Sequence, residues 1–408
     1  MLKNFTPLRR RNYRLLWSAF LVSTAGDVFF EVGIIVAVFE RTGSALQTMT
    51  VTVATFLPGF LLGPFAGAWV DRYSRRRLMI AADIASAGLV GALLLFEDIT
   101  TNMPLLYAIV VGLAAVSPLR KPARLALIPL LVPRRELVAA NSLMLATQQV
   151  GRALGFALGG VLVLKLGIAG LIVINTATFA LAAIAVLFIV LPDGENRSVK
   201  RTAEPLRRSI AAGLSYLKNH PIARPLVVME VLEHLPHGIW HSALMLVFTQ
   251  QALGGQADAW GYQNSAHYGG TIVGATLAIA LASWVGKRPG WAIIIDGFIG
   301  GLFTLGYALS PDLAWALLFS ALMGPAAALR DVAQDALLQS CLDDEYMGRV
   351  QATRTMAAQL VFITAGVFFA WLADAVDIRW IYISGGLLYM LTGCYALSKI
   401  AIRRSRIE

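Results

Sequence analysis

Charge is scarce in this chain. Of its 408 residues only 14% are Asp, Glu, Lys or Arg and 57% are hydrophobic, whereas soluble domains are about a quarter charged. The two cysteines, Cys341 and Cys394, lie far apart in the sequence, so they have no metal-ligand spacing and imply no disulfide. A GxxxxGK[ST] phosphate-binding loop is also missing, which excludes direct use of ATP through such a loop. The low charge excludes an ordinary soluble domain.

The apolar residues are gathered in twelve long blocks. Most blocks reach the roughly 20 residues that a helix needs to cross a ~30 Å hydrocarbon core. They lack the alternation of apolar and polar residues that is typical of a membrane β-barrel. The sequence therefore predicts an all-α membrane protein with twelve transmembrane helices. The blocks are 15–39, 49–70, 78–96, 104–116, 137–164, 168–191, 226–253, 268–285, 291–309, 313–329, 350–373 and 380–400.

The net charge of +10 lies mostly on one side of this predicted topology. With the N-terminus inside, most Lys and Arg residues fall in cytoplasmic connections. The opposite loops keep only Arg41, Lys165 and Arg379. This distribution follows the positive-inside rule and predicts that both termini are cytoplasmic. Because topology accounts for the positive charge, we expect no nucleic-acid partner.

A polar connector divides the blocks into two sets of six. We predict a six-helix bundle at 1–191, a cytoplasmic connector at 192–222 and a second six-helix bundle at 223–408. AWVDR at 68–72 corresponds to SWVGK at 283–287, and two further landmarks recur at an offset near 210 residues. Repeated halves of this kind are a known transporter architecture, in which the substrate site lies near the membrane midplane.

The loop after the second block reads GAWVDRYSRRR (67–77). It resembles the signature Gly-x-x-x-Asp-Arg/Lys-x-Gly-Arg/Lys-Arg/Lys of the major facilitator superfamily, with a serine in place of the second glycine. The resemblance implies a cytoplasmic gating motif that latches the two halves in one access state. The alternative is that its arginines only set the topology. The matching residues are Gly67, Asp71, Arg72, Arg75 and Arg76.

The resemblance covers nearly the whole chain. PARLALIPLLVPRRELVAANSL (122–143) and GRALGFALGGVL (151–162) are most similar to the drug- and siderophore-exporting branch, which includes macrolide- and enterobactin-exporter-like proteins. Gly151, Gly155 and Gly159 are spaced four apart on one helix face, which is typical of close helix packing. Because the Gly-Pro pair of the family's antiporter motif is missing, we interpret this face as packing first and as a sign of export second.

Two acids, Asp27 and Glu31, lie well inside the first block, in STAGDVFFEVGI. Because they are four residues apart, they project from one helix face. A charged side chain near the bilayer centre costs about 2.5–3.5 kcal/mol on insertion scales, so such residues usually line a functional cavity. We predict that both bind protons or substrate. The alternative is that both are paired structurally with an arginine from elsewhere in the chain.

The seventh block contains EVLEHLPHGIWH, with three of the five histidines of the chain. We expect Pro236 and Gly238 to interrupt this helix at mid-depth, where freed carbonyls would face a cavity. Four ionisable side chains share a stripe about 60° wide on such a helix. They are Glu230, His234, His237 and His241.

Three interpretations of this stripe compete. Histidine titrates near neutral pH, so the stripe could relay protons. Imidazoles with carboxylates also suit a divalent transition metal, and the histidines could instead be satisfied core residues. Because no recognised metal motif is present, proton coupling is favoured over metal, and no cofactor is expected. In the metal alternative the ligands would come from His234, His237, His241, Asp27, Glu31 and His267.

Further charged residues lie in the third, ninth and eleventh blocks and directly after the tenth. Asp83 and Asp296, in the third and ninth, receive no assigned role. We expect the remainder, toward the cytoplasmic helix ends, to form ion pairs between the halves that break on opening. These are Arg330, Asp331, Asp335 and Arg354.

The sequence and the resemblance together predict a bacterial inner-membrane secondary transporter rather than an enzyme, with two pseudo-symmetric six-helix bundles. We expect alternating access coupled to the proton gradient, and export by antiport of a small organic compound such as a drug or siderophore. That substrate class rests on the resemblance. The alternative is transport of a divalent transition metal or its chelate. The expected partners are the lipid bilayer, protons and a small-molecule substrate, and the protein is expected to be a monomer.

Overall fold

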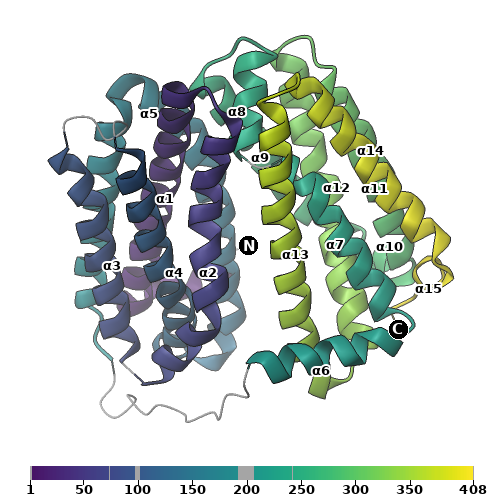
Figure 1. Cartoon of the computed structure of the whole chain (residues 1–408). Coiled ribbons are helices and arrows are strands. Elements are labelled where there is room, and N and C mark those ends of the chain that lie inside the picture. The colour runs from purple at the N-terminus through teal and green to yellow at the C-terminus, as the bar shows by residue number, and fades with distance from the viewer. Residues whose placement is uncertain (1, 73, 97–101, 192–205, 241, 408) are drawn as a thin grey trace. The chain divides into compact units, whose positions relative to one another are not determined.

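The computed structural model describes residues 2–72, 74–96, 102–191, 206–240 and 242–407 (Figure 1). In these ranges the regular structure is helical, and no strand occurs. The chain folds into two compact units. The first comprises Met1–Gly43 and Thr50–Ala203, and the second comprises Ser44–Met49 and Glu204–Glu408.

Five α-helices account for the first half of the chain. They are α1 (Arg11–Thr42), α2 (Ala45–Arg72), α3 (Arg75–Ala92), α4 (Met103–Leu131) and α5 (Leu137–Leu187). Short 3-10 helices precede or join them, namely η1 (Leu2–Arg9), η2 (Leu93–Leu95) and η4 (Arg134–Glu136). Within the unit α1 packs along α5, and α3 packs against both α4 and α5 (Figure 1).

Ten α-helices account for the second half. They are α6 (Leu206–Asn219), α7 (Ala223–Ile239), α8 (Ser242–Gln251), α9 (Ala257–Ala280), α10 (Ala282–Lys287), α11 (Pro289–Ala308), α12 (Leu313–Cys341), α13 (Asp344–Ala373), α14 (Ile378–Ser398) and α15 (Ile400–Arg403). In this unit α12 packs along α9 and α11, whereas α7 packs against α13 and α14.

The helix α5 makes two crossings. It is 51 residues long, about twice the length that one crossing requires. Gly167 inside it has φ 63° and ψ −178°, a conformation that no helix contains and that glycine adopts readily. The chain therefore turns at Gly167, between the two blocks that the sequence separates at the same place.

The two halves of α5 run in opposite directions along α1. For the first half of α5, residues with higher numbers contact residues of α1 with higher numbers, so these two helices are parallel. For the second half, residues with higher numbers contact residues of α1 with lower numbers, so it is antiparallel to α1. Small residues at these positions let the helices approach closely. The contacts are Gly151–Thr24, Gly155–Val28 and Gly159–Val32 for the first half, and Gly26–Thr178 and Gly33–Leu171 for the second.

By length and composition, nine helices among the described residues could cross a membrane. One of the nine, Arg134–Leu187, contains the two crossings of α5. The broken pair α7–α8 and the helix α9 fall outside the nine but occupy the predicted seventh and eighth blocks. Counted in this way, the helices match the twelve apolar blocks of the sequence.

The seventh span is divided into α7 and α8, but not where the sequence suggested. The expectation that Pro236 and Gly238 interrupt the helix is wrong, because α7 continues through both and ends at its C-cap, Trp240. The Trp240 N–H still donates to the carbonyl of Pro236 at 3.3 Å. Gly238 instead permits a close approach, since an added Cβ would lie 2.7 Å from the backbone nitrogen of Gly366 in α13.

Part of the predicted connector at 192–222 is an ordered helix of the second unit. Figure 1 shows α6 lying across one end of α13, and the two helices are in contact. The Tyr216 ring stacks on Tyr346 with centroids 4.5 Å apart. Gly213 faces α13 so closely that an added Cβ would lie 2.5 Å from Oγ1 of Thr353. The rest of this connector, up to residue 205, lies outside the described residues.

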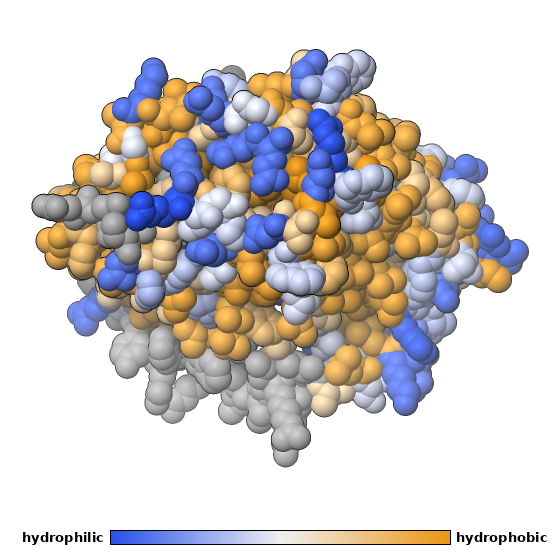
Figure 2. All heavy atoms as spheres, turned by 45° about the horizontal axis from the view of Figure 1, so that its top comes forward, coloured by the Kyte–Doolittle hydropathy of each residue, from blue (hydrophilic) through white to orange (hydrophobic). Residues whose placement is uncertain are grey.

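Apolar side chains cover much of the outer surface, and Figure 2 shows broad hydrophobic areas on the visible face. Large residues with more than half of their surface exposed occur in both units, such as Leu95 at 83%, Phe188 at 56% and Trp380 at 66%. A soluble monomer rarely exposes contiguous apolar patches beyond a few hundred Å². This surface is suited to contact with lipid chains.

The contact between α1 and α5 gives a stability test. In Gly155→Ala the new methyl would lie 2.8 Å from Cγ1 of Val28, so we expect overpacking to cost about 1–3 kcal/mol. The matched control is Gly88→Ala in α3, where nothing lies within 4 Å of the added Cβ and helix propensity favours alanine by about 0.5–1 kcal/mol. Thermal unfolding of the purified protein in detergent should show a lower midpoint for Gly155→Ala only. Equal midpoints would contradict this account of the packing.

Candidate functional site

The first unit contains a polar cavity of about 240 Å³. It is lined from α1, α3, α4 and the first half of α5, together with Ala182 of the second half. Both predicted acids of the first span, Asp27 and Glu31, line it, as does Asp83 of α3. Its basic lining residues are Arg120, Lys121, Arg124 and Arg152. The cavity therefore brings three acids and four bases together inside apolar helices.

Arg120 of α4 lies between two of these acids. Its Nη1 atom is 3.7 Å from Oδ2 of Asp27 and 3.8 Å from Oδ1 of Asp83. Its guanidinium also lies over the ring of Phe179, 4.8 Å from the centroid, where a cation is attracted by the ring face. The Asp83 side chain is 4% exposed, whereas that of Asp27 is 41% exposed. Asp27 thus has both an arginine neighbour and access to the cavity.

Arg124 is a second, half-buried base of this cavity. Its guanidinium lies 3.7 Å from the centroid of the Phe20 ring. Its Nε atom is buried and makes no hydrogen bond among the described residues. Such an unsatisfied donor costs stability unless a ligand or water accepts from it. Together with Arg152 and Glu31, Arg124 completes a lining able to bind a polar compound.

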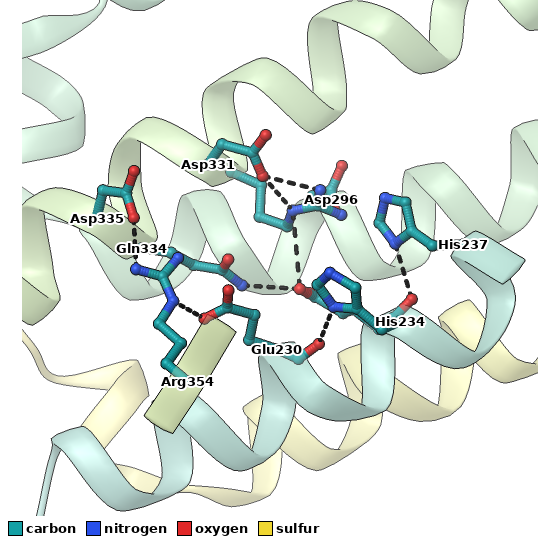
Figure 3. A network of polar contacts seen from close by, with 10 residues as sticks. Glu230, His234, His237, Asp296, Asp331, Gln334, Asp335 and Arg354 are labelled. Atoms are coloured by element: carbon teal, nitrogen blue, oxygen red, sulfur yellow. Dashed lines mark hydrogen bonds and ion pairs between the residues drawn. The ribbon is translucent and has the colours of Figure 1, made fainter. Parts of the chain in front are cut away.

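The second unit holds a buried network centred on Arg330 of α12 (Figure 3). The arginine donates from Nη1 to Asp296 of α11 at 3.1 Å and from Nη2 to Asp331 at 2.9 Å. Its Nε atom lies 3.7 Å from Oε2 of Glu233 in α7. Gln334 donates to the same Glu233 oxygen at 2.9 Å. One arginine is therefore surrounded by acids from three helices.

A second arginine, Arg354 of α13, joins the edge of this network. It forms an ion pair with Glu230 and bonds Asp335 at 2.6 Å. The pairs that we expected to join the two halves through Arg330 and Arg354 thus lie within the second unit. Glu230, predicted as a proton site, is an ion-pair partner here because Arg354 comes within reach from a different helix.

Two histidines of the predicted stripe, His234 and His237, form hydrogen bonds with backbone carbonyls of their own helix. His234 donates from Nδ1 to the carbonyl of Glu230, and His237 donates from Nδ1 to the carbonyl of Glu233, both at 2.8 Å. A carbonyl can only accept, so each neutral ring carries its proton on Nδ1 and leaves Nε2 as an acceptor. The two rings lie 5.4 Å apart. The hydrogen bond at Nδ1 agrees with the interpretation of structural histidines. The Nε2 atom of each ring can still accept a proton.

The metal alternative finds no support in the part of the chain that is described. His241 lies outside the described residues. No group of three or more His, Cys, Asp or Glu side chains among those described is arranged to hold a metal ion. His267, a candidate ligand, instead stacks beside Trp240 with ring centroids 6.4 Å apart. We assign no metal ligand in this protein.

The predicted gating motif is only partly described, because of Gly67, Asp71 and Arg72 only the backbone is described. Arg75 donates to the carbonyl of Ala126 in α4 at 3.1 Å. Arg76 donates to carbonyls in the last turn of α5, including Val186 at 3.2 Å. Cations are favourable at helix C-termini, where carbonyls are unpaired. Both arginines therefore bind helices of their own unit, and the latch between halves stays a prediction.

The two units carry equivalent charged groups inside their helix bundles. In each, an arginine has acids on two other spans of the same unit: Asp27 and Asp83 around Arg120, and Glu233 and Asp296 around Arg330. The equivalent residues are separated by 206, 213 and 210 residues, respectively. They occupy corresponding spans, the first and seventh, third and ninth, and fourth and tenth. Sequence reasoning left Asp83, Asp296 and Glu233 without a role. The repeat offset of about 210 relates Asp83 to Asp296, whereas from Asp27 it leads to His237, about one helical turn beyond Glu233.

The helices are long enough to cross a membrane, and they enclose buried ion pairs and a polar cavity. These features together are typical of a multi-pass membrane transporter of small substrates. Residues 2–335 match the family described as "Transmembrane secretion effector". The chain belongs to this family, which is part of the major facilitator superfamily. The suspected family and the all-α fold of two six-helix bundles are thereby confirmed.

Relatives and solved structures extend this comparison. The chain is 29% identical over 293 residues to the uncharacterised MFS-type transporter YjbB of Bacillus subtilis, covering 71% of this chain and 70% of the relative. It is 24% identical over 381 residues to macrolide efflux protein A of Streptococcus pyogenes, covering 91% and 92%. A solved bacterial homologue of the human lysosomal transporter Spinster shares the fold at TM-score 0.69 and 14% identity, covering 96% of both chains.

The Arg330 network gives a paired test of buried against exposed charge. Asp296 and Asp331 bond the same arginine, but their side chains are 6% and 63% exposed. Asp296→Asn removes a buried charged partner and should cost about 1.5–3 kcal/mol. Asp331→Asn should stay within about 1 kcal/mol, as exposed pairs do. Thermal unfolding in detergent measures both, and similar losses would contradict the assigned difference in burial.

Proposed function

We propose that this protein is a proton-coupled secondary transporter that exports a small organic compound by antiport. It works by alternating access in a bacterial inner membrane, as a monomer with both termini in the cytoplasm and without a cofactor. Family membership supports transport, and the likeness to macrolide efflux protein A supports export. Proton coupling rests on the acids that line the cavity of the first unit. No observation favours metal transport over this function.

The single observation that carries proton coupling is the position of Asp27. Its carboxylate is 41% exposed where it lines the cavity, and it is 3.7 Å from Arg120. At this separation the pair is longer than a normal hydrogen bond, so a proton can reach the carboxylate from the cavity. Protonation removes the charge of Asp27, so Asp83 is then the remaining ionised partner of Arg120. The proton thereby changes the charge that the cavity offers to a substrate.

Glu31 and Arg152 lie on the same cavity and extend this site along α1 and α5. A substrate that binds where Asp27 and Glu31 are ionised competes with protons for the same carboxylates. Competition of this kind couples the two movements in opposite directions, because each ligand binds best when the other has left. The cavity residues thus have a defined part in antiport.

Charge and relatives point to different members of the substrate class. The cavity has four basic against three acidic lining residues. Its bases suit a compound with acidic groups, such as a siderophore, whereas competition with protons at Asp27 and Glu31 requires a cationic or hydrogen-donating group on the substrate. The relative named for macrolide efflux favours a drug. We therefore keep both as candidate substrates, and the assay must compare them.

Flux into proteoliposomes tests the function. With the purified protein reconstituted, we expect uphill movement of a labelled macrolide or of an iron-free catecholate siderophore when a pH gradient is imposed. A protonophore should abolish this movement. No movement of either compound would overturn the proposed substrate class, and movement driven only by a sodium gradient would overturn proton coupling. Empty liposomes provide the control for leakage.

The role of Asp27 has a separate test. Asp27→Asn should abolish uphill flux driven by the pH gradient while substrate exchange at equilibrium continues, because the amide cannot release a proton. Asp27→Glu should retain part of the uphill flux. The matched control is Glu40→Gln, an exposed acid near the end of the same helix, which should behave as the wild type. Full uphill flux in Asp27→Asn would assign the proton to another group.

A further inference from the structure

Glu233 is the most buried acid of the Arg330 network. Its side chain is 2% exposed. One carboxyl oxygen, Oε2, accepts from Gln334 at 2.9 Å and lies 3.7 Å from Arg330. The other oxygen, Oε1, is buried without a hydrogen-bond partner among the described residues. A buried carboxylate that stays ionised needs a close cation and several hydrogen bonds, and Glu233 has neither in full.

The charges around Glu233 do not balance if every acid is ionised. Arg330 has its short contacts with Asp296 at 3.1 Å and with the exposed Asp331 at 2.9 Å. Asp296 therefore takes the single buried positive charge. Arg354, the next cation, is committed to Glu230 and Asp335. An ionised Glu233 would leave an uncompensated negative charge in the apolar interior, which costs far more than an unsatisfied hydroxyl.

The charged and titratable groups that face Glu233 come from five helices. From α7 these are Glu230 and the two histidines, of which His237 donates to the Glu233 carbonyl and not to its carboxyl. The others come from α11, α12, α13 and α14. They are Asp296, Arg330, Asp331, Gln334, Asp335, Arg354 and Tyr389. Among the residues that the structure describes, Arg330 and Gln334 alone contact the Glu233 carboxyl oxygens.

We propose that Glu233 is a second proton-binding site, in the second unit, equivalent to Asp27 in the first. The proposal rests on the proposed function for its role in transport, but the bound proton itself follows from the geometry. The proton forms an O–H bond at the carboxyl group and discharges it. Its loss restores a carboxylate, which Arg330 stabilises only if it shifts away from Asp296. Proton release at Glu233 is thus tied to a rearrangement of α7 against α11 and α12.

Infrared difference spectroscopy of the purified full-length protein tests the site without any transport measurement. A protonated carboxyl has a carbonyl stretch that shifts in heavy water, and we expect this band in the wild type near neutral pH. Glu233→Gln should remove the component that Glu233 contributes. The matched control is Glu230→Gln on the same helix, which should leave the band intact because Glu230 is ionised beside Arg354. An unchanged band in Glu233→Gln would overturn the proposal.

Two further measurements keep the result unambiguous. If Glu233→Gln does not fold, Glu233→Asp retains a carboxyl group and should shift the band instead of removing it, and an unshifted band would overturn the proposal. In proteoliposomes, Glu233→Gln should lose most uphill flux yet keep equilibrium exchange. If the wild type shows no flux at all, the proposed function fails, whereas the infrared band still decides whether Glu233 carries a proton.

Discussion

An ionised side chain can stay inside an apolar helix bundle only if an opposite charge reaches it from another helix. In both units an arginine meets this condition for acids on two other helices. Close helix packing lies directly beside these ion pairs. Val28, directly after Asp27, packs closely against Gly155. Gly297, directly after Asp296, lies so close to Gly393 that an added Cβ would be 2.6 Å from its Cα. Glycine contacts thus fix the depth at which each acid meets its arginine.

Both units place an arginine between two acids, but the distances and the exposure of the acids differ. Around Arg120 both acids lie near 3.7 Å, and one of them is open to a cavity. Around Arg330 one acid is bonded at 3.1 Å and the other is closed off. A loose, hydrated pair exchanges protons readily, whereas a dry pair changes only when its helices move. In the proposed function, the first unit would therefore bind the proton and the substrate, and the second would link protonation with conformational change.

Much of the fold could be predicted, because membrane helices must be long and apolar and the inside loops positive. The twelve blocks, the turn at Gly167 and the cavity position of Asp27 follow from such local rules. The partner of each acid could not be read in this way. Helical spacing places Glu230 and Glu233 of α7 on neighbouring faces, but only tertiary structure brings Arg354 from 124 residues away to Glu230. The isolated acids Asp83 and Asp296 carry no local signal either.

The repeat supplies the information that local rules lack, and it also shows where the halves differ. A charge buried in one half predicts a charge in the other, as Arg120 and Arg330 illustrate. The predicted gating motif does not follow this rule, because Gly286 stands where the first half has Asp71. The carbonyl of Gly286 instead accepts from the backbone of Ile407 at 2.9 Å, so this loop holds the C-terminal segment. What is duplicated is the buried charge pattern, whereas the loop that could gate it is present once, and any latch formed by Asp71 acts from one half only.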